Sequence, residues 1–450
     1  MPHELDQILI SESQLDFEKR LLDFYFSKAG LAVFRLSDMW DKDGKFNEES
    51  RFTQVIKILI QVMKEGDRAV AEYTKEYDDI ELSPDEFRVS KEDLKKAHDE
   101  INKELLKSIR QAIENVRKYQ SEIYIGNFKH PGIKYTAIKR VGICVPGASA
   151  PLPSTVIMTA VPAQVAGVKE IAVVSPPRYK GSIHPVILAV CKELGIDEVY
   201  RIGGAQAVAA LTYGTETKGK KTIREVDKIV GPGNQWVQTA KQIVFGAIGI
   251  DSIAGPSEVL IIANDGANPA WVAADMLSQA EHDPGCAFLF TDSRELAEKV
   301  LDELKNQVKK LARSEETTEC LKKFSGIAVF DDLDYAVDKA NEFAAEHLQI
   351  QCGERSREIE KKIKNAGAIF IGDYSPVAVG DYWAGPSHTL PTGKSALFAS
   401  ALSANDFVKS TSIIEYDKEK LAKSAEDIIR LAEVEGLDAH AKSIKIRQQD

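Results

Sequence analysis

The chain has 450 residues, 44% of them apolar and 28% charged, which is typical of a globular protein with room for two to four domains. Its formal net charge of −11 argues against a nucleic-acid or anionic-membrane partner, since both require a basic face, although backbone N–H groups can still hold the phosphates of a dinucleotide. The acidic N-terminus does not resemble a signal peptide, no run reaches the length of a membrane span, and five scattered cysteines indicate reduced thiols, so we expect a cytoplasmic protein.

The first part of the chain is predicted to be helical scaffold. Residues 52–75 carry apolar side chains at helical spacing. A capping box that begins at Ser90 opens a second long helix, which runs to about residue 119. No pattern in this part suggests chemistry.

From residue 140 onward, short apolar strands alternate with helices, and this alternation predicts a parallel sheet with helices on its faces. Three loops rich in small residues follow the expected strands, at 146–155, 203–206 and 231–234. Ligands of such sheets bind beyond the carboxyl ends of the strands, so the loops favour one shared crevice. None is a G-x-G-x-x-G fingerprint, and each could equally be a tight connection. The expected strands are 141–146, 170–175, 198–202 and 227–230, with helices near 155–165, 183–194 and 205–212 between them.

A second alternating block begins at residue 258 and predicts another α/β unit. After about residue 400 the chain is expected to become a helical tail, with helices at 405–411 and 418–435. The strands expected in the second block are 258–263, 287–291, 326–330, 348–352 and 368–371, with helices near 269–282, 294–311, 333–345 and 356–366.

The second block also carries the side chains that suggest chemistry. Gln279 and His282 are three residues apart at the end of a buried helix, so both lie on one face, although such a histidine is often only a capping residue. Glu346 and His347 stand where a helix passes into a strand and offer two bases with different pKa values, or two surface residues of a helix end. Together with Asp381, read alone as a turn residue, and His440, the helix-end pair would make a mixed nitrogen and oxygen set suited to zinc.

Five motifs, in matching order and nearly matching spacing, resemble the histidinol dehydrogenase family from about residue 50 to the end. They are Gly255–Val259, Ser278–Pro284, Ala345–Leu348, the stretch from Gly380 to Pro391, and Glu435–His440.

The resemblance implies a fold and a division of the chain. The fold is α/β, with two incomplete Rossmann-like parallel-sheet domains, helical N-terminal and C-terminal segments, and an intertwined homodimer. The expected divisions are an N-terminal extension (1–50), a first α/β domain with a helical part (51–139 and 257–400), an NAD-binding α/β domain (140–256), and a helical C-terminal segment that reaches into the partner subunit (401–450).

The resemblance also implies zinc and NAD as cofactors and assigns the site residues. Zinc is expected on Gln279, His282, Asp381 and His440, with Glu435 and His440 completing the neighbouring subunit's site. All four zinc ligands, together with Ser257, His347, His388 and Glu435, are expected to contact the substrate, while Cys144, Gln206 and Asn234 are expected along the NAD.

The reaction of the family is the oxidation of an amino alcohol to an aldehyde and then to an amino acid, with two NAD reduced. In this chain His347 is expected to take the alcohol proton, and Glu346 to activate the water that hydrates the aldehyde. Zinc would mainly orient the substrate rather than generate a nucleophile.

Several departures from the family pattern stand out. Cys144 replaces a tyrosine that usually contacts the cofactor, and Ala148 replaces a glycine of the same loop. Residues 217–224 look longer and more basic than usual, and the first fifty residues are extended. Alternatives to the leading hypothesis are a dehydrogenase of the same fold acting on another polar amino alcohol or diol, a zinc hydrolase, and a non-catalytic binding protein.

Overall fold

The computed structural model describes residues 5–6, 8–10, 47, 49–147, 151–282 and 285–448. Most of the expected N-terminal extension, together with Ala148, Asp283 and Pro284, therefore lies outside the described residues. The chain divides into two compact units. Unit 1 contains the residues up to 124 and residues 137–407, and unit 2 contains residues 125–136 and the chain from 408 onward.

The first sheet of unit 1 has five parallel strands in the order β5-β4-β3-β8-β9. All four strands predicted for this block are present, and β9 adds a short fifth strand at the edge. Gly142 in the central strand lies against Leu211 and Val226, so this strand can pack closely against the chain that covers it. The strands are β3 (Arg140–Cys144), β4 (Glu170–Val174), β5 (Glu198–Tyr200), β8 (Lys228–Val230) and β9 (Gly249–Ile250), and the helices are α6 (Pro153–Val165), α7 (Pro185–Glu193), α8 (Gly204–Tyr213) and α9 (Gln235–Val244).

The segment between α8 and β8 forms a small antiparallel hairpin of two strands, β6 (Thr215–Thr217) and β7 (Lys220–Ile223). The turn between them contains Lys218 and Gly219, both with positive φ. The longer and more basic segment noted in the sequence is thus an ordered β-hairpin. Thr217 and Thr222 both donate hydrogen bonds to the buried carboxylate of Asp67, at 2.6 and 2.5 Å.

The N-terminal helices pack on the helices around this first sheet. Contacts join α2 to α8 and α9, α3 to α8, α4 to α7, and α5 to α6. The chain's 51–122 stretch, which the sequence analysis grouped with the second block, therefore contacts the helices of the first. These helices are α2 (Arg51–Glu65), α3 (Asp67–Asp78), α4 (Lys91–Glu100) and α5 (Lys103–Glu122).

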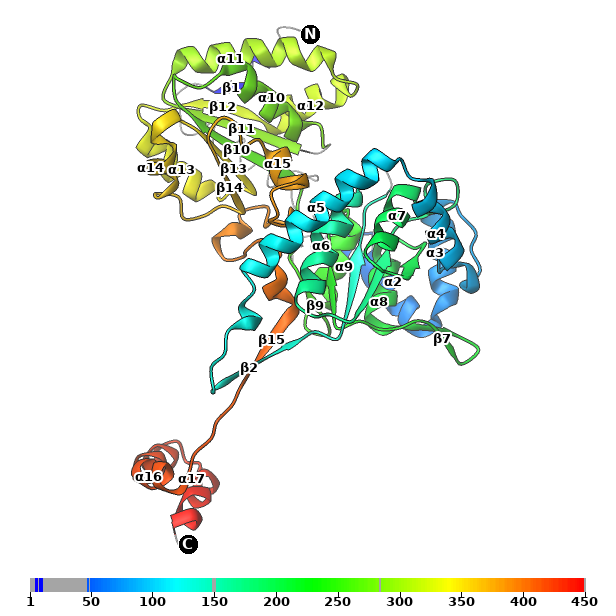
Figure 1. The fold of residues 1–450 in the computed structure, drawn as a ribbon, viewed down its shortest axis with the longest axis vertical. Helices are drawn as coiled ribbons and strands as arrows, with labels where there is room; N and C mark the ends of the chain where they lie inside the picture. Colours follow the sequence, from blue (N-terminus) through cyan, green and yellow to red (C-terminus); the bar gives the residue numbers. More distant parts are fainter. Residues whose placement is uncertain are drawn as a thin grey trace. The chain divides into compact units, whose positions relative to one another are not determined.

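The second sheet has six parallel strands in the order β1-β12-β11-β10-β13-β14. Alternate residues of its strands belong to two separate apolar cores, one formed with α10, α11 and α12 and the other with α13 and α14. Figure 1 shows these helices on the two faces of the sheet. The five predicted strands are β10 (Ser257–Ala263), β11 (Gly285–Thr291), β12 (Gly326–Val329), β13 (His347–Gln351) and β14 (Ala368–Ile371), and the helices are α10 (Pro269–Ala280), α11 (Arg294–Gln307), α12 (Ser314–Phe324), α13 (Leu333–Phe343), α14 (Ser356–Glu360) and α15 (Val377–Tyr382).

A sixth strand, β1 (Leu9–Ile10), comes from the expected N-terminal extension and pairs in parallel with β12. Next to it, Leu5 and Ile8 are buried in the core that contains α10 and α11. The extension thus contributes to the second sheet.

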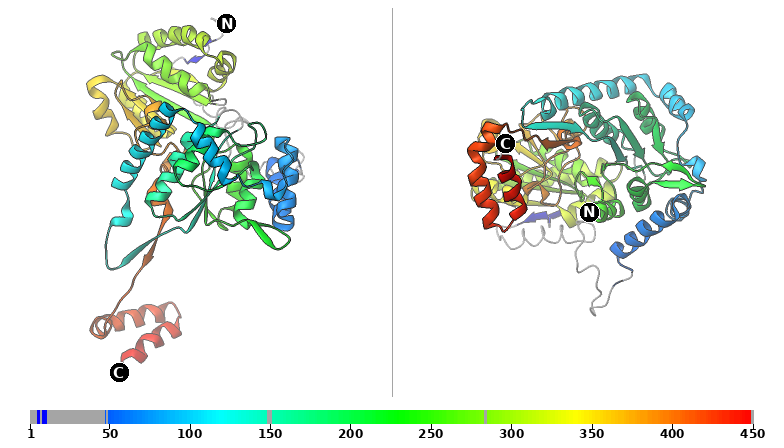
Figure 2. Two further views of the ribbon diagram at one scale, coloured as in Figure 1. Left: turned by 45° about the vertical axis from the view of Figure 1, so that its right-hand side comes forward. Right: turned by 90° about the horizontal axis from the view of Figure 1, so that it is seen from below.

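Unit 2 is built around a two-stranded sheet of β2 (Ile133–Ala137) and β15 (Val408–Ser412), followed by α16 (Lys418–Val434) and α17 (Asp438–Lys445). The two helices pack against each other (Figure 2). The prediction of a helix over 405–411 is wrong beyond Phe407, because Val408-Lys-Ser-Thr-Ser412 pairs along β2 as an extended strand. Short-range periodicity could not reveal a partner strand nearly 300 residues earlier.

The prediction of two incomplete Rossmann-like parallel sheets with helical flanking segments is confirmed. Among the described residues, no helix is long and apolar enough to cross a membrane.

Candidate active site

Two buried bases lie at the start of β13, where the chain leaves α13 through Ala344 in a left-handed conformation. Glu346 is fixed by β10: its Oε2 accepts a hydrogen bond from the Ser257 hydroxyl at 2.7 Å and another from the backbone N–H of Glu258 at 2.9 Å. His347 Nδ1 lies 3.0 Å from the carbonyl oxygen of Glu258. The two side chains expected to act as bases thus share one anchoring strand.

His347 links this anchor to Asp381. Its Nδ1 is 3.5 Å from Glu346 Oε2, and its Nε2 is 3.7 Å from Asp381 Oδ1. Burial alone would lower the pKa of His347, yet the carboxylates of Glu346 and Asp381 outweigh it and raise that pKa to about 9. Burial raises the pKa of Glu346. Among the residues that the structure describes, His347 Nε2 has no hydrogen-bond partner, which leaves it available to a ligand.

Asp381 was interpreted as a turn residue when considered alone, but it lies in the short helix α15. Burial opposes its ionisation, and the neighbouring imidazoles, His347 first, reverse that effect and lower the pKa of Asp381. The close approach of α15 to the sheet requires Gly380, because a Cβ atom there would lie 2.6 Å from the Phe370 ring. Asp381 is therefore presented as a carboxylate beside His347.

Gln279 and His282 lie at the end of α10, as the sequence predicts. The helix ends at Ala280, and the backbone N–H of His282 still bonds to the Gln279 carbonyl at 3.3 Å. Glycine is required at Gly285, the first residue of β11, because a Cβ atom there would lie 2.0 Å from the same carbonyl oxygen. Desolvation lowers the pKa of His282, so its imidazole is neutral at physiological pH.

These donors fit a divalent metal ion. A neutral imidazole, a carboxylate and an amide form a mixed nitrogen and oxygen set suited to zinc. Gln279 is buried, and its Nε2 has no hydrogen-bond partner in the part of the chain that the structure describes. An amide flip would present Oε1 at that position instead. Within the described residues, no three His, Cys, Asp or Glu side chains group closely enough to hold a metal by themselves. Three of the four expected ligands belong to unit 1, and the fourth, His440, to unit 2.

His388 and Ser257 border the same cluster. Burial lowers the pKa of His388, and Asp381, His347 and His282 all act on it electrostatically. His388 and His347 also line a cavity of about 320 Å³ that includes Asp381. Ser257 is the first residue of β10, and its hydroxyl donates a hydrogen bond to Glu346.

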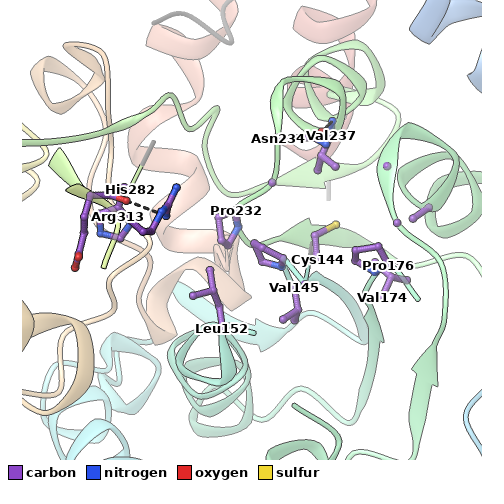
Figure 3. A pocket seen from close by; sticks show the side chains of 17 residues that line it. Cys144, Val145, Leu152, Val174, Pro176, Pro232, Asn234, Val237, His282 and Arg313 are labelled. Atoms are coloured by element: carbon purple, nitrogen blue, oxygen red, sulfur yellow. Dashed lines mark hydrogen bonds between the residues drawn. The ribbon is translucent and has the colours of Figure 1, made fainter. Parts of the chain in front are cut away.

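The three glycine-rich loops line one cavity of about 410 Å³, as the sequence predicts. It begins at the carboxyl ends of β3, β4 and β8 and extends to His282 and Arg313 of the second α/β block (Figure 3). Gly231, with φ of 106°, is required in one loop because a Cβ atom would lie 2.3 Å from the Cys144 carbonyl oxygen. The cavity thus joins the loops expected to hold a cofactor to one of the expected metal ligands.

The three expected cofactor residues have different environments. Cys144 lines the cavity but is almost fully buried, and burial raises the pKa of its thiol to about 12, so it is a neutral apolar wall. Asn234 also lines it, and its Oδ1 caps α9 by accepting from Trp236 and Val237. Gln206 is buried beside an adjoining cavity, and neither of its amide atoms is hydrogen bonded to another described residue.

Glu435 and His440 lie in unit 2 and are exposed there. Glu435 is the C-cap of α16, and His440 is in the first turn of α17. Unit 2 also exposes large apolar side chains, including Ile414, Leu431 and Val434.

Sequence reasoning missed a buried ion pair beneath the cofactor loop. Lys241 pairs with Asp251 and donates to the Gly231 carbonyl at 3.0 Å, while Asp251 accepts from the Gly231 N–H at 2.6 Å. Together they hold the backbone of the 231–234 loop. The only signal in the sequence was a lysine on an otherwise buried helix face, which is hard to distinguish from an exposed one.

Comparisons with known proteins identify the family of the chain. A family model described as histidinol dehydrogenase matches residues 42–448. The chain belongs to the histidinol dehydrogenase family.

Two curated histidinol dehydrogenases illustrate the likeness. That of Rhodopirellula baltica is 48% identical over 399 residues, covering 87% of this chain and 85% of the relative, and that of Oceanobacillus iheyensis is 46% identical over 404 residues, covering 88% and 93%. A crystal structure of histidinol dehydrogenase from Elizabethkingia anophelis superposes with a TM-score of 0.83 at 34% identity, covering 92% of this chain and 96% of that one. As a member of the histidinol dehydrogenase family, the chain is an oxidoreductase.

Proposed function

We propose that the protein catalyses the NAD- and zinc-dependent four-electron oxidation of L-histidinol to L-histidine through histidinaldehyde. The observation that carries this proposal is the cavity that joins the cofactor loops at 147, 203 and 233 to His282. A dehydrogenase must bring its dinucleotide and its substrate carbon into one water-poor space, and this cavity begins at such loops and ends at a predicted metal ligand.

The first oxidation needs a group that removes the alcohol proton while hydride leaves the same carbon for NAD. His347 suits this role in its neutral form, because Nε2 has no hydrogen-bond partner among the described residues while Nδ1 lies against the Glu258 carbonyl oxygen. That contact fixes the orientation of the ring. A cation bound to Asp381 would offset one of the two carboxylate charges that raise the pKa of His347 and would so favour that neutral form. The products of this step are the aldehyde, NADH and a proton.

The second oxidation requires the aldehyde to add water before a second hydride can leave. Glu346 suits the activation of this water, since burial raises its pKa and thereby strengthens it as a base. Ser257 and the Glu258 N–H hold its Oε2 in place. In total one alcohol, one water and two NAD⁺ give one carboxylic acid, two NADH and two protons.

Gln279, His282 and Asp381, with His440 of a second subunit, would hold the zinc ion, which when bound orients the imidazole and amine of the substrate. Ser257, His388 and Glu435 complete the substrate contacts in this proposal. The exposed apolar side chains of unit 2 support a homodimer with shared sites, since a second copy would cover them.

The test is NADH formation from L-histidinol by the purified protein. We expect about two NADH per histidinol, loss of activity with a chelator, and recovery with zinc. Parallel assays with other amino alcohols and diols distinguish histidinol from a different polar substrate. Metal-dependent hydrolysis of an ester or amide, without NADH from any alcohol, would contradict the proposal and favour a zinc hydrolase.

A further inference from the structure

The helix α10 carries another acidic side chain before its two predicted metal ligands. Asp275 lies four residues before Gln279 and seven before His282, so the three share one face of the helix. Asp275 is half-buried, and no step of the proposed reaction uses it. A carboxylate on the covered face of a helix is costly unless it finds hydrogen-bond partners.

The partners of Asp275 are two buried amides of β13. Its Oδ2 accepts hydrogen bonds from Gln349 Nε2 at 2.9 Å and from Gln351 Nε2 at 2.7 Å. Gln349 is 1% exposed and Gln351 is 2% exposed. Burial raises the pKa of Asp275, and the two hydrogen bonds oppose that rise because they favour the ionised form. The contact is thus a hydrogen-bonded carboxylate that connects α10 to β13.

The two glutamines belong to the same row of β13 as the base of the first oxidation. Side chains of a strand alternate between its two faces, so His347, Gln349 and Gln351 lie on one face. The two residues between them pack into the core on the opposite face. Since α10 connects the end of β10 to the start of the parallel strand β11, it runs antiparallel to the strands. Its C-terminal end therefore lies near the strand starts, and Asp275 lies one turn further along the sheet.

Gln349 extends this connection to the element that carries Asp381. Its Nε2 also lies 3.4 Å from the carbonyl oxygen of Ser375, two residues before α15 begins. Val377, the first residue of α15, packs in the same apolar core as α10. Asp275 and Gln349 together therefore join α10, β13 and the approach to α15. These three elements carry the predicted metal ligands of unit 1 and the base of the first oxidation.

We propose that Asp275 is a positioning residue, whose hydrogen bonds to β13 hold α10 where its two metal ligands can share one ion with Asp381. This inference rests on the proposed function, because it assumes the zinc ion predicted there. Asp275 touches neither the ion nor the substrate and acts through the backbone of α10. Ligands that are ordered before the ion arrives lose less conformational entropy on binding, so the affinity for the metal rises.

The test measures the affinity of the full-length, metal-free protein for Zn²⁺ by competition with a chromogenic chelator, and the visible absorption spectrum of bound Co²⁺. Asp275→Ala should lower the zinc affinity by about tenfold to a hundredfold, the usual effect of removing a group that orients metal ligands. The Co²⁺ spectrum should change, because the ligand geometry loosens. With the metal site saturated, kcat should fall while KM for NAD stays within about twofold of wild type, since the loops of the first sheet are unaltered.

Two further variants separate positioning from stability. Asp275→Asn keeps an oxygen that can accept the same two hydrogen bonds, so its zinc affinity should lie within about threefold of wild type. Asp67→Ala is the matched control, because Asp67 is also a buried acid that accepts two side-chain hydrogen bonds, from Thr217 and Thr222, but it holds the hairpin of β6 and β7. This control should lower the stability and leave the zinc affinity unchanged.

An unchanged zinc affinity in folded Asp275→Ala, or an equal loss in Asp67→Ala, would overturn the inference. A loss in Asp275→Asn as large as in Asp275→Ala would also contradict it, because the charge rather than the hydrogen bonds would then act. If Asp275→Ala does not fold, Gln349→Met provides a second test. It keeps the hydrogen bond from Gln351 and should lower the zinc affinity by about threefold to tenfold, and an unchanged affinity would refute the positioning role.

The outcomes also separate this inference from the proposed function. A wild-type protein that binds zinc with an affinity independent of Asp275, and that still forms NADH from histidinol, would refute the inference alone. An affinity that depends on Asp275 in a protein that forms no NADH would support the inference and refute the proposed reaction. A wild-type protein that binds no zinc would refute both.

Discussion

Both sheets of unit 1 carry a cluster of buried charges at the amino ends of their strands, and the two clusters differ in how their polar atoms are used. In the first sheet, Arg140 donates to Glu198 at 2.6 and 2.9 Å and to Glu170 at 3.2 Å, from the starts of three neighbouring strands. In the second, His347 Nε2 and Gln279 Nε2 have no hydrogen-bond partner among the described residues, and both belong to side chains expected to meet a ligand; in the first, the one such atom of Arg140 is its Nε.

This difference suggests that the first cluster serves stability and the second serves catalysis. The Arg140 cluster joins opposite charges at hydrogen-bonding distance, so its net effect is to hold the sheet edge together. The Glu346 cluster places His347 between the carboxylates of Glu346 and Asp381, and it leaves buried nitrogens without a partner among the described residues, which costs free energy until a ligand arrives. The two clusters should therefore respond to mutation in opposite ways.

The largest effect is expected at the two bases. His347→Asn should lower kcat for alcohol oxidation by about a hundredfold to ten-thousandfold, the usual contribution of a general base. Glu346→Gln should impair oxidation of added histidinaldehyde by a similar factor and alcohol oxidation much less. Stopped-flow NADH traces of each half reaction measure this split. Equal losses in both half reactions would refute the division of roles, and Ser257→Ala serves as a milder control.

Mixing two inactive variants tests the shared site. His347→Asn and His440→Asn should each be inactive as homodimers, but a hybrid dimer would contain one site free of both substitutions. Random reassociation after mild denaturation should restore up to about a quarter of wild-type activity, since half of the dimers are hybrids with one intact site. No recovery, despite hybrid dimers seen by native mass spectrometry, would show that His440 acts within its own subunit.

Substitution in the Arg140 cluster should affect stability and leave the chemistry intact. Arg140→Met removes the buried cation from Glu170 and Glu198 and leaves them only Arg224, at 2.7 and 3.5 Å. It should reduce the free energy of unfolding by about 3 kcal/mol, the lower end of the cost of breaking a buried ion pair. Denaturant titration measures the change, and kcat per folded molecule should stay close to wild type. A large loss of kcat with little loss of stability would mean that the two clusters are not functionally separate.

The smallest expected effect is a change in the free energy of unfolding at acid pH. Burial opposes ionisation of Glu198, but hydrogen bonds from Arg140 and Tyr200 outweigh it and lower its pKa from 4.5 to about 2. Because the folded pKa is depressed, its stabilising contribution is complete above about pH 4.5 and is lost as the pH falls toward 2. Glu198→Gln should flatten the stability profile in that window. Urea titrations at several pH values measure the free energy of unfolding against pH. If Glu198→Gln shows the same acid dependence as the wild type, Glu198 is not the group responsible.

Much of the architecture was predictable because it depends on local pattern. The nine strands predicted for the two sheets are all present, since fully buried parallel strands are short apolar runs between helices. The strand at Val408–Ser412 was mistaken for a helix because its partner is far away in the sequence. The buried pair of Lys241 and Asp251 could not be predicted either, because its role is to hold the Gly231 backbone, which only folding brings close to both side chains.

For the candidate site, residue types and helix spacing brought Gln279 and His282 together, and the strand junction placed Glu346 beside His347. The meeting of Asp381 with His347 is a tertiary contact between α15 and β13, which sequence spacing does not encode. The resemblance to the family supplied that association. The position of His440 relative to these residues remains a prediction that the hybrid experiment tests.

The short strand β1 has a practical consequence for handling the protein. It lies before residue 42, where the match to the family model begins, yet it covers one edge of β12, and Leu5 and Ile8 fill part of the adjoining core. Trimming the gene to the family boundary would leave an unpaired row of backbone donors and acceptors and an apolar gap beside it. Such a truncated product should aggregate during expression. A product that starts at residue 1 and so retains β1 should stay monodisperse.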